Sequence, residues 1–69
     1  MRNGNDELWE TANKALANGR WGEARRALDD LNYFHKNSAV DALPIPPSAP
    51  DFIRDRIELW NSHVERRVS

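Results

Sequence analysis

All four prolines of the chain lie within residues 44–50, and this cluster constrains the fold more than any other feature. A proline inside a helix removes a backbone donor and clashes with the preceding turn, so this stretch cannot be helical and favours an extended, polyproline-like path. Leu43 and Ile45 are apolar. We therefore expect a Pro-rich strap over residues 37–49 that packs across the helices; a free linker is the alternative.

Helical periodicity precedes the prolines in two segments, residues 6–18 and residues 21–36. Asn5 is placed as the N-cap of the first helix and Gly19 as the residue that ends it. Because only Gly19 and Arg20 separate the segments, the helices should fold back as an antiparallel hairpin. The inward faces should hold Leu8, Ala12, Ala15 and Leu16 on the first helix and Trp21, Ala24, Ala27, Leu28, Leu31, Phe34 and His35 on the second.

A third helix is expected over residues 50–66, after the prolines. Ser48 is placed as its N-cap, with Asp51 three residues later as in a capping box. Two apolar stripes run along this helix, and together they are wider than the stripe of an ordinary surface helix. The first stripe is Ile53, Ile57, Trp60 and Val64, and the second is Phe52, Leu59 and His63. One hairpin cannot cover both stripes.

The length of 69 residues predicts one helical domain, residues 1–69, with a core too small to supply more than a few kcal/mol of net stability. The chain contains no cysteine, so disulfides and thiolate metal sites are excluded and self-association is the remaining reinforcement. We therefore predict an all-α homodimer. Its interface is expected to consist of Phe52, Arg56, Leu59, Trp60 and His63.

Charge and hydropathy exclude several classes of function. Ten Lys/Arg against eleven Asp/Glu give a net charge of −1, which lacks the basic footprint of general phosphate binding. The first residues do not resemble a signal peptide, and no stretch approaches the roughly 18 apolar residues of a membrane span, so we expect a cytoplasmic protein. His35 and His63 lack the spacing of a metal site, and no cofactor is expected.

Residues 8–31 resemble part of a tetratricopeptide repeat. In that family a glycine opens the turn between helices, an aromatic residue follows two positions later, and an alanine follows three positions after that. Gly19, Trp21 and Ala24 have this spacing. No second repeat is present, so the resemblance implies a single helical hairpin used for protein binding.

The chain is also similar in general character to small phage-encoded antagonists, such as the anti-activators of quorum-sensing regulators and the inhibitors of pilus-assembly ATPases. The similarity lies in length, balanced charge and the lack of a catalytic residue set. It implies that the partner is another protein, such as a transcriptional regulator.

Tyr33 is the most informative single residue, because it is expected on the side of its helix opposite the apolar face. Either solvent or the strap covers it, or it is an interface hot spot beside arginine. The arginines near the start of that helix either form solvated ion pairs or recognise an acidic surface or a phosphate. The predicted partner-binding residues are Arg20, Arg25, Arg26, Asp29 and Tyr33.

The carboxylate pairs Asp6/Glu7 and Asp29/Asp30 should face solvent, so nothing supports acid–base catalysis, and we predict that the protein is not an enzyme. The leading hypothesis is a protein that binds and inhibits another protein. A structural subunit of a larger assembly is the first alternative. A helix-turn-helix nucleic-acid binder is the second, although the two aspartates would face phosphates unfavourably.

Overall fold

The predicted all-α fold is confirmed by the computed structural model of the chain, which describes residues 4–35 and 41–68, with side chains through Arg66. Its helices are α1 (Gly4–Ala17), α2 (Trp21–Tyr33) and α3 (Asp51–Val68). None of the helices in this part of the chain is long and apolar enough to cross a membrane.

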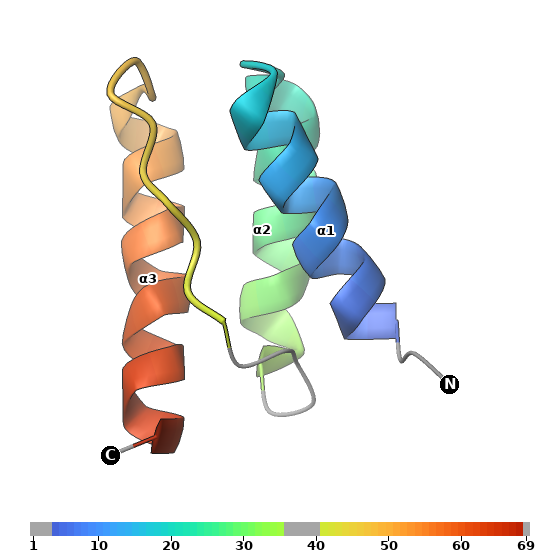
Figure 1. Cartoon of the computed structure of the whole chain (residues 1–69), viewed down its shortest axis with the longest axis vertical. Helices are drawn as coiled ribbons and strands as arrows, with labels where there is room; N and C mark the ends of the chain where they lie inside the picture. The colour runs from blue at the N-terminus through green and yellow to red at the C-terminus, as the bar shows by residue number, and fades with distance from the viewer. Residues whose placement is uncertain (1–3, 36–40, 69) are drawn as a thin grey trace.

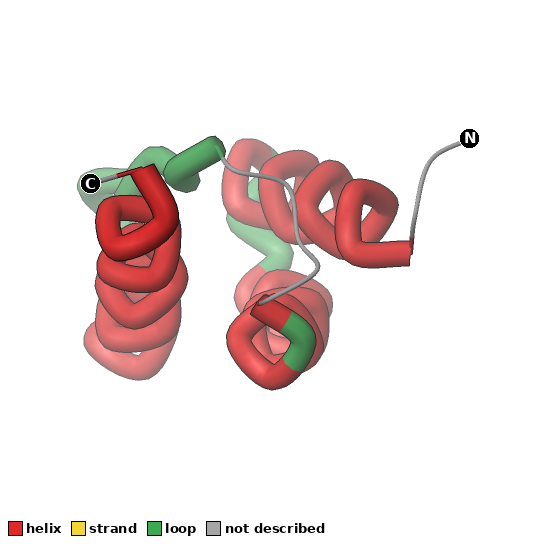
Figure 2. The backbone as a smooth tube through the Cα atoms, turned by 90° about the horizontal axis from the view of Figure 1, so that it is seen from below, coloured by secondary structure: helices red, strands yellow, loops and turns green. Residues whose placement is uncertain are grey.

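The helices follow one another in a simple path (Figure 1). α1 and α2 lie side by side and run in opposite directions, as the predicted hairpin requires. Residues 41–50, which we call the proline-rich segment, carry the chain back along α3, so that α3 runs in the same direction as α2. Figure 2 looks along α2 and α3 and shows this segment on the side of the molecule between α3 and α1.

The turn between α1 and α2 has the hydrogen bonds of a Schellman motif. The N–H of Gly19 donates to the carbonyl of Leu16 (3.3 Å), and the N–H of Arg20 donates to the carbonyl of Ala15 (2.9 Å). Gly19 has a φ of 69°, the left-handed conformation that glycine adopts without steric cost. The prediction that Gly19 ends the first helix is therefore confirmed.

Two glycine substitutions should change stability in opposite directions. Gly19→Ala puts a side chain on a left-handed backbone and should cost about 1 kcal/mol, because the strain remains even though the nearest atom to the new Cβ is 4.0 Å away. Gly22→Ala lies inside α2 with open space around it, and should stabilise by roughly 0.5–1 kcal/mol. Urea unfolding of both variants measures this. If both substitutions changed the free energy of unfolding in the same direction, the conformational explanation would be contradicted.

Asn5 does not cap α1, and that prediction was wrong. The helix already includes Gly4, and the Asn5 side chain is buried, with its Nδ2 donating to the carbonyl of Phe34 at 2.8 Å. This bond ties the start of α1 to the end of α2. A tertiary partner for the amide has replaced the local capping role that the sequence suggested.

The end of α2 and the start of α3 also differ from the prediction. α2 ends at Tyr33 and not at Lys36, which lies outside the described residues; Phe34 leaves helical geometry at φ −101° and ψ 25°. Ser48 is not the N-cap of α3, because the helix begins at Asp51. Ser48 instead lies in a turn in which the N–H of Ala49 donates to the carbonyl of Pro46 (3.1 Å).

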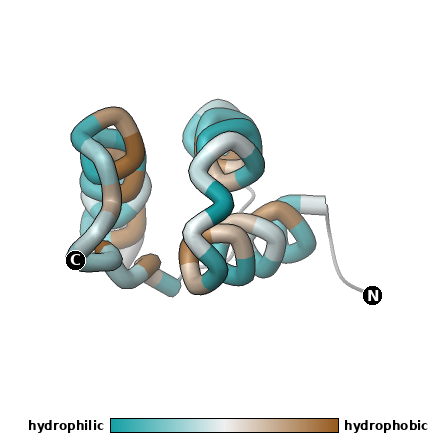
Figure 3. Tube along the Cα trace, turned by 90° about the horizontal axis from the view of Figure 1, so that it is seen from above, coloured by the Kyte–Doolittle hydropathy of each residue, from teal (hydrophilic) through white to brown (hydrophobic). Residues whose placement is uncertain are grey.

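Small residues let α1 and α2 approach closely. Ala12 and Ala24 are fully buried, and Ala15 and Ala27 are nearly so, as the sequence predicted. α3 adds its core stripe, and Figure 3 shows its hydrophobic residues gathered on the side that faces the other helices. Each fully buried large side chain contributes about 1.5–3 kcal/mol of transfer free energy. These side chains are Leu28, Leu31, Ile53, Ile57 and Trp60.

The proline-rich segment is held to the helices by side chains. Asn61 of α3 accepts from the N–H of Leu43 (2.8 Å) and donates to its carbonyl (3.0 Å). The carbonyl of Asp41 accepts from the indoles of both Trp9 and Trp60, each at 3.0 Å. Leu43 is almost completely buried. Residues 37–40 of the expected strap lie outside the described part of the chain.

Candidate protein-interaction surface

Large apolar side chains remain exposed at the end of α2 and along one edge of α3. Tyr33 is the most exposed of them, at 79%, and its ring meets that of Phe34 edge-on with centroids 4.7 Å apart. On α3, Phe52 is 42% and Leu59 is 49% exposed. Single exposed apolar residues are common, so what matters is whether these residues belong to one surface.

An ion pair joins the edges of α2 and α3 that carry these residues. The Nε of Arg56 donates to Asp29 Oδ1 at 2.7 Å, and Asp29 also lies 3.8 Å from Arg25. Arg56 further donates to the carbonyl of Phe52 at 2.6 Å, and its guanidinium lies 6.0 Å from the centroid of the Phe52 ring. A continuous series of contacts therefore runs from Arg25 to Phe52.

These contacts bring together two sets of residues that the sequence suggested as separate surfaces. Asp29 belongs to the predicted partner-binding set and Arg56 to the predicted dimer interface, yet the two side chains are bonded to each other. We call the combined surface the α2–α3 face. It consists of Arg25, Asp29, Tyr33, Phe52, Arg56, Leu59 and His63.

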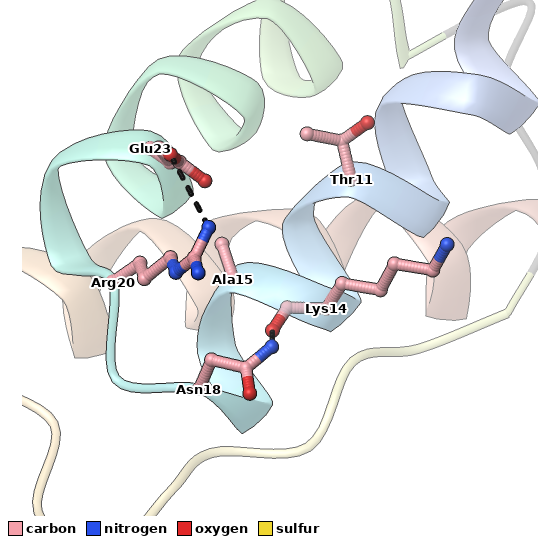
Figure 4. A pocket seen from close by; sticks show the side chains of 6 residues that line it. All are labelled: Thr11, Lys14, Ala15, Asn18, Arg20 and Glu23. Carbon is pink, nitrogen blue, oxygen red and sulfur yellow. Dashed lines mark hydrogen bonds and ion pairs between the residues drawn. The ribbon is translucent and has the colours of Figure 1, made fainter.

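Arg20 and Arg26 lie away from the α2–α3 face. Arg20 is at the turn between α1 and α2, 3.8 Å from Glu23, beside a polar hollow (Figure 4). In that hollow Asn18 donates to the carbonyl of Lys14. This hydrogen bond and the Arg20–Glu23 ion pair both join residues that are close in sequence, near the turn. Arg26 lines an adjoining cleft, on the α1 side of α2. The predicted partner-binding set is therefore divided among three places.

Trp60 was assigned both to the core stripe and to the dimer interface, and in the single chain it lies in the core. Its side chain has no exposed area in the single chain, and its Nε1 donates to the carbonyl of Asp41. A second copy could reach it only if the fold opened. Position on a helical wheel cannot distinguish these roles, because Trp60 lies near the border between the two stripes.

Two polar contacts of α3, one with α2 and one with His35 just after α2, were not anticipated. The rings of His35 and His63 stack with centroids 4.0 Å apart and planes inclined by 11°. Asn32 donates from Nδ2 to the carbonyl of Arg56 at 3.2 Å, whereas its buried Oδ1 has no hydrogen-bond partner. The only signal in the sequence was that both histidines fall near the ends of the helices expected from sequence, and this does not indicate contact.

The described residues hold no group of three His, Cys, Asp or Glu side chains close enough together to bind a metal ion. The α2–α3 face offers aromatic rings, an aliphatic side chain and paired charges. Such a set is suited to contact with another macromolecule.

Comparison with known proteins adds no relative: no protein-family model, no curated protein and no solved structure matches the chain.

Proposed function

We propose that this chain is a small, non-catalytic interaction protein that binds another protein, such as a regulator, and inhibits it. The observation that carries the proposal is Tyr33, 79% exposed on the same face as the ion pairs of Asp29. Tyrosine and arginine are enriched among the residues that dominate binding energy at interfaces. The proposed binding surface is the α2–α3 face, and the proposed location is the cytoplasm.

The arrangement of the face supports this role. Arg56 is held by Asp29 and by the carbonyl of Phe52, so its guanidinium is already ordered before a partner arrives. Preordered side chains lose less conformational entropy on binding. The neighbouring aromatic rings supply apolar area at low entropic cost because each has only two side-chain torsions.

The test uses a partner that is first identified by affinity capture with mass spectrometry and is then purified. Tyr33→Ala/Arg25→Ala should weaken its binding by about thirtyfold, as expected for removal of a hot spot of about 2 kcal/mol. The matched control is Arg20→Ala/Arg26→Ala, which removes one charge at the turn before α2 and one on α2, both away from the α2–α3 face. Thermal melts show whether both variants are folded.

A structural subunit of a larger assembly is the second candidate, favoured by the exposure of Phe52 and Leu59 on α3. For such a subunit, Phe52→Ala/Leu59→Ala would weaken assembly, whereas Tyr33→Ala/Arg25→Ala would not. Unchanged binding by a folded Tyr33→Ala/Arg25→Ala variant would contradict the inhibitor proposal.

We also propose that the protein is a homodimer that uses the α3 edge of the same face, around Phe52, Leu59 and His63. Two observations support this. The core of one chain is small, and the edge of α3 leaves two large apolar side chains in solvent. In an isologous dimer each copy would cover the edge of the other.

A further inference from the structure

The proline-rich segment shows a three-residue pattern of burial. Leu43 is buried and Pro46 is half-buried, whereas Pro44, Ile45 and Pro47 are exposed; the turn closed by the bond from the N–H of Ala49 to the carbonyl of Pro46 ends this pattern. A polyproline II helix has three residues per turn, so every third residue lies on the same edge. The segment therefore turns one edge toward the helices and leaves two edges in solvent. Pro44 and Pro47 are both exposed, and because they are three residues apart they lie on the same outer edge.

Hydrogen bonds order the segment without using all of its backbone. The carbonyl of Leu43 is held by Asn61, that of Pro46 by the N–H of Ala49, and that of Pro47 by the guanidinium of Arg54 at 3.1 Å. In the part of the chain that the structure describes, the carbonyls of Pro44 and Ile45 accept no hydrogen bond. These two adjacent carbonyls can therefore accept hydrogen bonds from a partner, while hydrogen bonds hold the residues on either side in place.

An apolar cleft of about 360 Å³ borders the same stretch. Its far wall comes from the end of α1 and the start of α2, including Leu16 and Trp21. Ile45, 38% exposed, contributes to the near wall. No charged residue lies between Asp41 and Asp51, so a partner would recognise this surface through shape, apolar contact and the two carbonyls.

We propose that residues 43–47 form a preordered polyproline II ligand for the aromatic-lined groove of a proline-recognition domain. Such grooves receive exposed prolines between aromatic rings, and tyrosine and tryptophan donors in the groove bind the ligand's carbonyls. Pro44 and Pro47 present the required spacing, and the carbonyls of Pro44 and Ile45 present the acceptors. Holding the segment in its bound conformation lowers the entropic cost of association.

The experiment titrates the isotope-labelled full chain with purified SH3, WW and EVH1 domains and follows amide chemical shifts. At least one domain should bind saturably, with the largest changes at Ile45, Ser48 and the Trp21 indole. Pro44→Ala should weaken that binding about tenfold or more. Pro50→Ala is the matched control, because it removes one proline that lies outside residues 43–47 and outside the cleft. Melts of both variants confirm folding.

Three outcomes would overturn the proposal: no domain binds, Pro44→Ala binds as tightly as the unsubstituted chain, or Pro50→Ala loses as much affinity as Pro44→Ala. A change of oligomeric state in Pro44→Ala would also overturn it, since a second copy of the chain would then be the occupant. The result is separate from the function proposed for the α2–α3 face. Tyr33→Ala/Arg25→Ala should leave binding of the proline-recognition domain unchanged.

Discussion

Replacing Trp60 with alanine is expected to leave most of the protein unfolded at room temperature. Trp60 is the largest fully buried side chain, and removing such a residue costs about 3–5 kcal/mol through lost burial and the cavity left behind. The core of a chain this short rarely supplies more than about 3–5 kcal/mol in total. The loss is therefore comparable to the whole net stability. Far-ultraviolet circular dichroism and a urea titration measure it.

Trp60→Phe provides the matched control. Phenylalanine keeps a buried aromatic ring and loses the indole donor to the carbonyl of Asp41. That carbonyl still accepts from Trp9, so no buried acceptor is left without a partner, and the variant should fold with a loss of about 1–2 kcal/mol. A cooperative, near-normal melt of Trp60→Ala would show that α3 contributes little to stability.

Light scattering at tens of micromolar is expected to report a dimer, and Leu59→Arg should weaken the dimer about tenfold or more by placing a charge in the interface. Leu59 is 49% exposed in the single chain, so the substitution should leave the monomer folded. Glu58→Arg introduces the same side chain at the adjacent exposed position, on a different side of α3, and should leave dimerisation unchanged. A monomer with a cooperative melt would contradict the dimer.

Dimerisation and partner binding should compete. Arg56, at the proposed dimer edge, is bonded to Asp29, within the proposed partner site, so a second copy on α3 would crowd the partner. If the dimer forms as expected, the apparent affinity of the unsubstituted chain for the partner should fall as the concentration of the chain rises, because less of the chain would be monomeric; titrations at several chain concentrations measure this.

The sequence predicted the helices well because their signals are local. The wheel pattern, the proline cluster and the left-handed turn at Gly19 each depend on residues within a few positions of one another. Helix ends were less predictable. Asn5 and Ser48 both had the chemistry of an N-cap, but Asn5 bonds to the distant carbonyl of Phe34, and Ser48 lies in a turn before α3 begins.

The candidate surface could be predicted only in part. The exposure of Tyr33 followed from its position opposite the apolar face of α2. The exposure of Phe34 did not, because it depends on α2 ending at Tyr33 and not continuing to Lys36 as expected. A difference of a few residues at a helix end is enough to turn a side chain from a buried face to an exposed one.

The four prolines separate the third helix from the hairpin in the structure, as they do in the sequence. The sequence alone determined that three helices form and which side of each is apolar. Only the tertiary structure decided which apolar edges meet. It buried Trp60 within one chain, stacked His35 on His63 and bonded Asp29 to Arg56 across 27 positions of sequence. The reason is physical: periodicity fixes the direction of a side chain about its own helix, whereas contact between helices depends on how the helices pack against one another in space.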